Sequence, residues 1–244
     1  MPIEVSPKTE PDKDRLAGYA AIKYSNALCS KIEKRYWELE HVKNNPLIIA
    51  IADFHQPRSM LWTHPFIMDY LYGIRCRKKE IDGRVEAHYE SIKEHTFGDK
   101  KKPSNFFSQP ETENISAVLF SNSGTISKFN RMGRLAGFGD AKVKIIRTGI
   151  CYNHAENSLD PAQFAIEVEE GKCTETWSEG VSIFHNPNAK FPLDPELFPL
   201  VGHHRLQEGR LASCLPAFFP IASITQVFTF SDGAGASPIS SPGQ

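Results

Sequence analysis

The chain has 244 residues, of which 40% are hydrophobic and 23% charged, with a formal net charge of -1. These values are typical of a folded globular protein, and they leave no overall field that favours nucleic acid or a membrane, so any basic site must be a local patch. No apolar run approaches the roughly 18 residues of a membrane span, and the polar start has no apolar signal core. Its five cysteines are dispersed singly, as expected for reduced thiols. We therefore expect a soluble, cytoplasmic protein.

The first predicted element is a basic amphipathic helix over Arg15–Trp37. The segment contains no proline, and apolar residues recur every four positions from Leu28 to Tyr36, which is the spacing of one helix face. Three lysines lie largely off that face: Lys23, Lys31 and Lys34. This helix face is either a phosphate or acidic-substrate contact or simply solvated.

A buried strand is predicted directly after this helix, at Leu47–Phe54, because a short, β-branched run is bounded by turn residues. A second, aromatic helix is expected at Met60–Tyr72, with Gly73 near its end. Ile81–Glu90 is expected to form a hairpin that turns at Asp82-Gly83.

The rest of the chain is predicted to be rich in strands. Residues 95–114 are polar and contain prolines, so we expect a long loop or the seam between two lobes. Five strands are expected beyond it: Ile115–Phe120, Val143–Arg147, Phe164–Val168, Val181–Phe184 and Ile221–Phe230. Ser231–Gln244 has no core-forming residues and is expected to be a disordered tail.

These elements predict an α+β or α/β fold, in which a central mixed sheet packs against the amphipathic helix near the N-terminus and the C-terminal half is strand-rich. The expected lobes are 1–94, with a helix and a strand, and 115–230, with the later strands. The alternative is that the second half completes the sheet of the first.

Asp53 and His55 stand where the first buried strand ends. The carboxyl ends of strands are a usual place for chemistry in open α/β sheets, so either side chain is a candidate base, water-orienting group or metal ligand. The alternative for an aspartate after a strand is a turn former or cap.

Ser121–Gly139 (SNSGTISKFNRMGRLAGFG) is the most distinctive stretch, because it combines small polar residues and glycines with three basic residues. Glycine lets backbone amides approach an anion, so the basic residues are candidate phosphate ligands: Lys128, Arg131 and Arg134. The stretch lacks both the GxxxxGK(S/T) spacing of a phosphate-binding loop and the GxGxxG spacing of a dinucleotide-binding turn. The alternative interpretation of this stretch is a glycine-bearing hairpin or bend that closes a sheet edge.

His203-His204 invites a metal interpretation, with His185 and Glu196 upstream. Adjacent residues on a strand point to opposite faces, so the pair is poorly placed to bind one ion. A small-molecule enzyme that uses His55, His185 or the His203-His204 pair is an alternative function, and convergence of these histidines within a few ångströms would favour it.

Four segments carry a resemblance to a known family: IKYSNALCSKIEKRYWEL, NPLIIAIADFH, SAVLFSNSGTISKFNRMGRLAGFG and FHNPNA. Together, from about Lys23 to Ile224, they resemble a family of uncharacterised bacterial proteins. Some members are named automatically as "glycosaminoglycan attachment site" from a Ser-Gly dipeptide. This resemblance implies no particular activity.

A weaker resemblance links Lys23–Phe54 to the restriction-endonuclease-like PD-(D/E)xK fold, in which a basic helix and a buried strand follow an acidic hairpin. The resemblance implies a divalent metal, Mg²⁺ or Mn²⁺, held by carboxylates, and Glu4 and Asp53 are the local candidates. Glu4 and Lys8 are four positions apart instead of the two that the motif requires. We therefore expect a chain that is truncated, misassigned at its start, or inactive as a nuclease.

The leading expectation is a nuclease-like protein that binds DNA or RNA through phosphate contacts. The expected phosphate ligands are Lys23, Lys31, Lys34, Lys128, Arg131 and Arg134. The alternatives are a non-enzymatic protein-interaction or structural module and the histidine-based enzyme.

Overall fold

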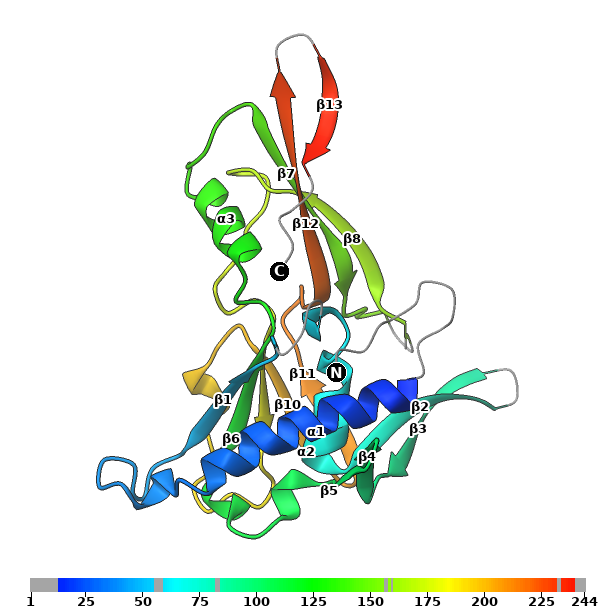
Figure 1. Ribbon diagram of the computed structural model, residues 1–244, viewed down its shortest axis with the longest axis vertical. Helices are drawn as coiled ribbons and strands as arrows, with labels where there is room; N and C mark the ends of the chain where they lie inside the picture. Colours follow the sequence, from blue (N-terminus) through cyan, green and yellow to red (C-terminus); the bar gives the residue numbers. More distant parts are fainter. Residues whose placement is uncertain are drawn as a thin grey trace.

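The computed structural model describes residues 13–54, 59–81, 84–155, 158, 160–231 and 234–239. Within them the chain forms a lower part, in which helices pack on a mixed sheet, and an upper part built from an antiparallel sheet and one helix (Figure 1). The expected mixed α+β architecture, with a helix near the N-terminus, is therefore confirmed. Glu4 and His55 lie outside the described residues.

The lower sheet has five strands that come from both halves of the chain. In spatial order they are β1 (Ile48–Ala52), β6 (Ala117–Ser121), β9 (Val181–His185), β10 (Gly202–Gln207) and β11 (Arg210–Cys214). β1 runs parallel to β6, β9 runs parallel to β10, and the other two pairs are antiparallel. The later strands thus complete the sheet that β1 begins. This arrangement agrees with the alternative in which the second half of the chain completes the sheet of the first.

Helix α1 (Lys13–Ile32) crosses this sheet beside α2 (His64–Tyr72) (Figure 1). It ends earlier than predicted, since Arg35 adopts a left-handed conformation at φ 47° and Tyr36–Glu38 forms a separate 3-10 turn. Its burial is also wider than one stripe, because every residue from Leu16 to Ile22 is buried.

The wide burial of α1 follows from a hairpin that packs on it. β4 (Glu94–Phe97) and β5 (Lys100–Pro103) form this hairpin, and β4 lies so close to α1 that a Cβ on Gly18 would be 2.0 Å from the carbonyl oxygen of Thr96. Phe106 and Phe107 in the next turn, η3 (Phe106–Ser108), are almost fully buried in the main core. Residues 95–114 are therefore part of the core structure, which corrects the expected loop or seam.

A second hairpin joins β2 (Ile74–Ile81) to β3 (Arg84–Ser91), with Ile81 paired with Arg84. It starts earlier than the predicted hairpin, and the proposed turn residues lie outside the described residues. Three further short turns are η2 (Ser59–Leu61), η4 (Thr112–Asn114) and η5 (Pro195–Leu197).

The upper part contains an antiparallel sheet and α3 (Ile126–Leu135). The strands are, in spatial order, β13 (Ala234–Ile239), β12 (Pro220–Ser231), β7 (Val143–Cys151) and β8 (Ala162–Glu167). Ala234–Ile239 belongs to the segment expected to be a disordered tail, and instead it pairs with the end of β12. Ser121–Gly139 contains a helix, not the sheet-closing hairpin or bend that was its alternative interpretation.

Replacing Gly18 with alanine should destabilise the protein, because the new methyl group would meet the backbone of β4, which is held by its own pairing. We expect a loss of about 1–3 kcal/mol in the free energy of unfolding, the usual cost of overpacking, measured by urea denaturation.

Gly133→Ala is the matched control, since Gly133 lies within α3 and a Cβ there would meet no atom within 4 Å. It should leave stability unchanged or raise it by up to about 1 kcal/mol through better helix propensity. Equal effects of the two substitutions would contradict the close contact between α1 and β4.

Candidate nucleic-acid interface

The β4–β5 hairpin is anchored to α2 by a buried polar chain. His95 Nε2 and Ser104 Oγ are 2.9 Å apart, and Ser104 Oγ donates a hydrogen bond of 3.0 Å to the carbonyl oxygen of Asp69. Burial, aided by the positive charge of Arg75, lowers the pKa of His95 to about 4, so the ring is neutral near pH 7. The hairpin is thus a fixed support for the side chains at its surface.

Aromatic rings and cations from α1 meet the tip of this hairpin. The Tyr19 and Phe97 rings form an edge-on contact with centroids 4.9 Å apart. The guanidinium of Arg15 lies 6.0 Å from the Phe97 centroid, and Nζ of Lys23 lies 5.3 Å from that of Tyr19. These cation–π distances place Arg15 and Lys23 along one side of α1, next to β4.

The hairpin adds more positive charge to the same region. We give the name basic face to the cations of these two packed elements, defined as Arg15, Lys23, Lys93, Lys100, Lys101 and Lys102. Along β5, Lys100 and Lys102 point to the side of Phe97, and Lys101 points to the side of Glu94. Lys101 Nζ lies 3.3 Å from Glu94 Oε1 in an exposed pair, and no ion pair among the described residues involves Lys93, Lys100 or Lys102. From 93 to 102 the chain carries four lysines against two carboxylates, Glu94 and Asp99.

The hairpin lysines were missed because their segment was interpreted as a loop. Gly98-Asp99 stands between Phe97 and Lys100, which pair in the hairpin, and Gly98 has a positive φ of 56°. A Gly-Asp pair between two short runs is a recognisable hairpin signal, and it could have located these residues.

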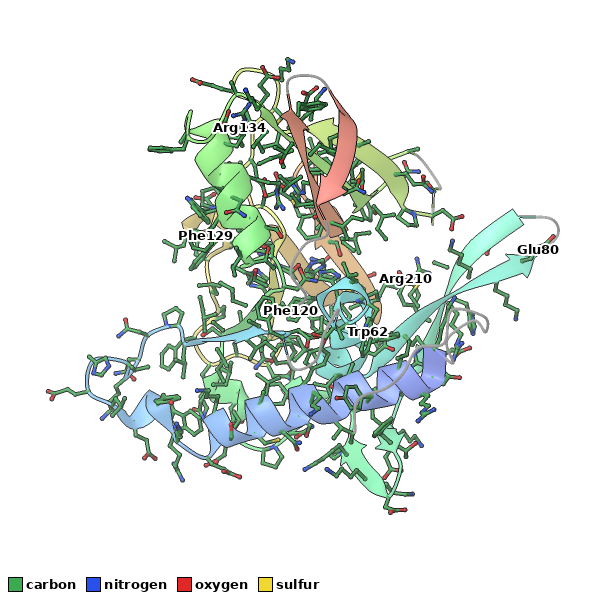
Figure 2. The ribbon with its side chains drawn as sticks, turned by 45° about the horizontal axis from the view of Figure 1, so that its top comes forward. Trp62, Glu80, Phe120, Phe129, Arg134 and Arg210 are labelled. Carbon is green, nitrogen blue, oxygen red and sulfur yellow. The ribbon has the colours of Figure 1, made fainter. Side chains whose placement is uncertain are left out.

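The predicted phosphate ligands on α1 do not all share this face. Lys23 belongs to it, whereas Lys31 lies in the last turn of α1 and Lys34 lies beyond it, with Nζ 6.0 Å from the Tyr36 ring centroid. Arg134 lies on α3 in the upper part, well away from α1 (Figure 2), and its Nη1 donates to the carbonyl oxygen of Asp140.

Lys128 and Arg131 are buried, so neither belongs to an exposed phosphate-binding surface as expected. Lys128 Nζ donates to the carbonyl oxygens of Trp177 and Glu179 at 3.1 and 2.9 Å. Arg131 forms a two-pronged ion pair with Glu175, with both N–O distances at 2.7 Å. The charged side of α3 faces inward because buried acceptors on residues 175–179 bind its cations. These acceptors lie more than 40 residues away in the sequence.

Asp53 is buried at the end of β1 and holds neighbouring elements together. The hydroxyl of Tyr24 lies 3.1 Å from Asp53 Oδ2 and 3.0 Å from the carbonyl oxygen of Thr63, while Ser59 Oγ donates to the Asp53 carbonyl oxygen. Burial and the negative charge of Asp53 raise the pKa of Tyr24 well above its usual value. These contacts connect β1 to α1 and to the turn before α2, and the Asp53 carboxylate bonds a tyrosine hydroxyl distant in sequence instead of capping a helix.

The described residues do not fit a divalent metal centre at this position. No group of three or more histidine, cysteine, aspartate or glutamate side chains in the described ranges is arranged to hold an ion. Asp53 contacts the Tyr24 hydroxyl.

The histidines separate onto the two faces of the lower sheet, as adjacent strand residues should. On one face, His203 Nδ1 lies 2.9 Å from His185 Nε2. On the other, His204 contacts Ser213 and Ser182, and His64 contacts the same Ser182 hydroxyl at 3.1 Å. His185 and His203 thus meet the proximity that the histidine-based alternative requires, and His204 does not join them.

Comparison of the chain with protein-family models, curated proteins and solved structures gives no match. In the part of the chain that the structure describes, no helix is long and apolar enough to cross a membrane.

Acidification should destabilise the fold because four histidines have lowered pKa values, mainly through burial. The pKa values are about 4 for His64, His95 and His185, and about 3 for His204. Between pH 6.5 and about 4 the unfolded chain binds more protons, so the free energy of unfolding should fall as the pH falls. Each histidine contributes up to about 1.4 kcal/mol per pH unit in this window.

Urea denaturation at several pH values, compared between the wild type and His204→Leu, measures this dependence. The variant should show a shallower slope of unfolding free energy against pH, whatever its stability at pH 7. An unchanged slope would contradict the assignment of His204 as a buried, neutral group.

Proposed function

We propose that this chain binds nucleic acid through its phosphates at the basic face. The supporting observation is that α1 and the β4–β5 hairpin, which pack on each other, carry six exposed or half-buried cations in a chain whose formal net charge is only -1. A local concentration of lysine and arginine is the electrostatic footprint of a phosphate-binding surface.

Lysine dominates this face, which favours contacts to the backbone of the nucleic acid over reading of its bases. An ammonium group is a flexible point charge, whereas base recognition commonly uses the planar fork of arginine or an amide. The binding we propose is therefore tolerant of sequence and strongly dependent on salt, because neutralising phosphates releases counterions.

The resemblance of Lys23–Phe54 to the helix and strand of restriction-endonuclease-like folds agrees with this proposal, since Lys23 belongs to the basic face. Cleavage is not part of the proposal, because the described residues do not fit a metal centre. Nucleic-acid binding by a nuclease-like chain remains the function with the most support.

The triple variant K100Q/K101Q/K102Q tests the proposal, because it removes three charges from an exposed hairpin while keeping side chains of similar length. Fluorescence anisotropy with a labelled DNA duplex and a single-stranded RNA, at about 50 to 200 mM salt, measures affinity. For the duplex, the slope of log K against log salt should become shallower by up to about 2.7, or about 0.9 for each phosphate that the variant no longer neutralises.

The matched control is K31Q/K34Q/K43Q, which removes the same charge near the other end of α1. It should leave affinity and slope close to those of the wild type. Absence of salt-sensitive binding to either probe would rule out the proposal, and loss of binding in the control alone would move the interface to the end of α1.

A second candidate, a non-enzymatic protein-interaction module, is favoured by the outer side of α3. Ile126 and Phe129 are 62% and 63% exposed, and Phe129 packs on Trp177, itself 56% exposed, with ring centroids 4.9 Å apart. Large exposed apolar groups that adjoin one another mark contact surfaces. Concentration-dependent association in light scattering, abolished by Phe129→Lys, would support this function, and a monomer at all concentrations would count against self-association.

A further inference from the structure

A pocket of mixed polar and apolar lining lies between the lower sheet and the upper part of the molecule. It occupies about 240 Å³ beyond the end of β6, where the chain enters α3, and β12 forms its opposite wall. One water needs only about 10–15 Å³ of such space, so the pocket has room for a ligand of several atoms.

Hydroxyl and guanidinium groups line this pocket. Five hydroxyls contribute to its wall: Ser123, Thr125, Ser127, Ser223 and Thr225. Arg131 and Arg147 line it as well, although their side chains are only 4% and 6% exposed. Arg131 Nη1 donates to Thr225 Oγ1 and Arg147 Nε donates to Ser223 Oγ, so both arginines are held against the pocket wall by hydroxyls.

The charges behind the wall do not balance. Arg131 is paired with Glu175, and Arg147 lies 2.5 Å from Glu179 and 3.5 Å from Glu175. Lys128 donates to backbone carbonyl oxygens in the same cluster, so three cations face two carboxylates. Although burial opposes ionisation, the hydrogen bonds from Arg131 and the charge of Arg147 hold the pKa of Glu175 below its usual value. Burial lowers the pKa of Lys128, whereas the charges of Glu175 and Glu179 oppose that shift. With Lys128 protonated, the cluster carries one excess positive charge in a poorly solvated place.

We propose that this pocket binds the phosphate group of a small ligand or of a nucleic-acid end. An anion there neutralises the excess charge of the cluster, which is costly to leave uncompensated away from water. Phosphate oxygens accept hydrogen bonds, and hydroxyl and guanidinium groups supply donors in this wall. The site goes beyond the basic face, with which it shares no residue.

The surroundings favour a phosphate ester over the free ion. A second, more apolar hollow of about 660 Å³ shares Leu61 and residues 222–224 with the pocket and also includes Phe164. An apolar or aromatic group attached to the phosphate therefore has adjoining surface to contact.

Ser127→Asp is the sharpest test of the pocket. Ser127 lies in the first turn of α3, where a carboxylate stabilises a helix, so the variant should fold at least as well as the wild type. Its charge would nevertheless stand in the pocket wall and repel an anion. Ile126→Asp is the matched control, because it adds the same charge one residue earlier, on a side chain that is 62% exposed and does not line the pocket.

Isothermal titration calorimetry with inorganic phosphate and a nucleoside 5′-monophosphate measures binding to the pocket, and thermal unfolding checks that both variants fold. We expect saturable binding to the wild type, a loss of about tenfold or more in Ser127→Asp, and a much smaller change in Ile126→Asp. No saturable binding of either probe, or equal losses in the two variants, would overturn the proposal.

Binding experiments with the K100Q/K101Q/K102Q variant distinguish a nucleic-acid end from a free nucleotide as the ligand of the pocket. This variant removes charge from the basic face and leaves the pocket intact. Preference for a 5′-phosphorylated oligonucleotide over its unphosphorylated form identifies a nucleic-acid end as the ligand, and preference for the nucleoside monophosphate identifies a free nucleotide. Failure of phosphate binding with retained salt-sensitive DNA binding refutes the pocket alone.

Discussion

The contact between α1 and β4 at Gly18 is the constraint on which the lower part of the molecule depends. Because residue 18 has no side chain, the backbone of β4 reaches the helix surface, and α1 becomes buried between the hairpin and the main core. The same contact brings the hairpin that carries the β5 lysines against the helix that carries Arg15 and Lys23. A packing requirement at one glycine thus creates the surface to which we assign nucleic-acid binding.

The elements that could be predicted are those with strong local patterns. The periodic apolar residues of α1, the β-branched run of β1 and the aromatic α2 were located, although the end of α1 was placed too late. β4 and β5 were missed because each is four residues long and mostly polar, and β10 and β11 because they follow the proline-rich residues 187–199. Short strands are specified by their partners more than by their own composition.

Candidate site residues were harder to predict, because the role of a charge depends on what surrounds it. Lys23 and Arg131 both stand on helices in basic stretches, yet Lys23 faces the hairpin at the surface and Arg131 is enclosed by Glu175 and Thr225. Glu175 and Thr225 lie far from Arg131 in the sequence, so no local pattern predicts that they bind it. Arginine suits the enclosed position, since its fork fits a carboxylate, and lysine suits the solvated face.

The parallel pairing of β1 with β6 has a consequence for how the chain acquires its structure. During synthesis from the N-terminus, β1 emerges well before its partner, and residues 53–116 must follow before β6 is available. Pairings between distant segments form slowly, because the loop between them must close first. The early half of the nascent chain therefore carries an unpaired apolar strand, and the ribosome-bound protein is exposed to aggregation until β6 and β9 arrive.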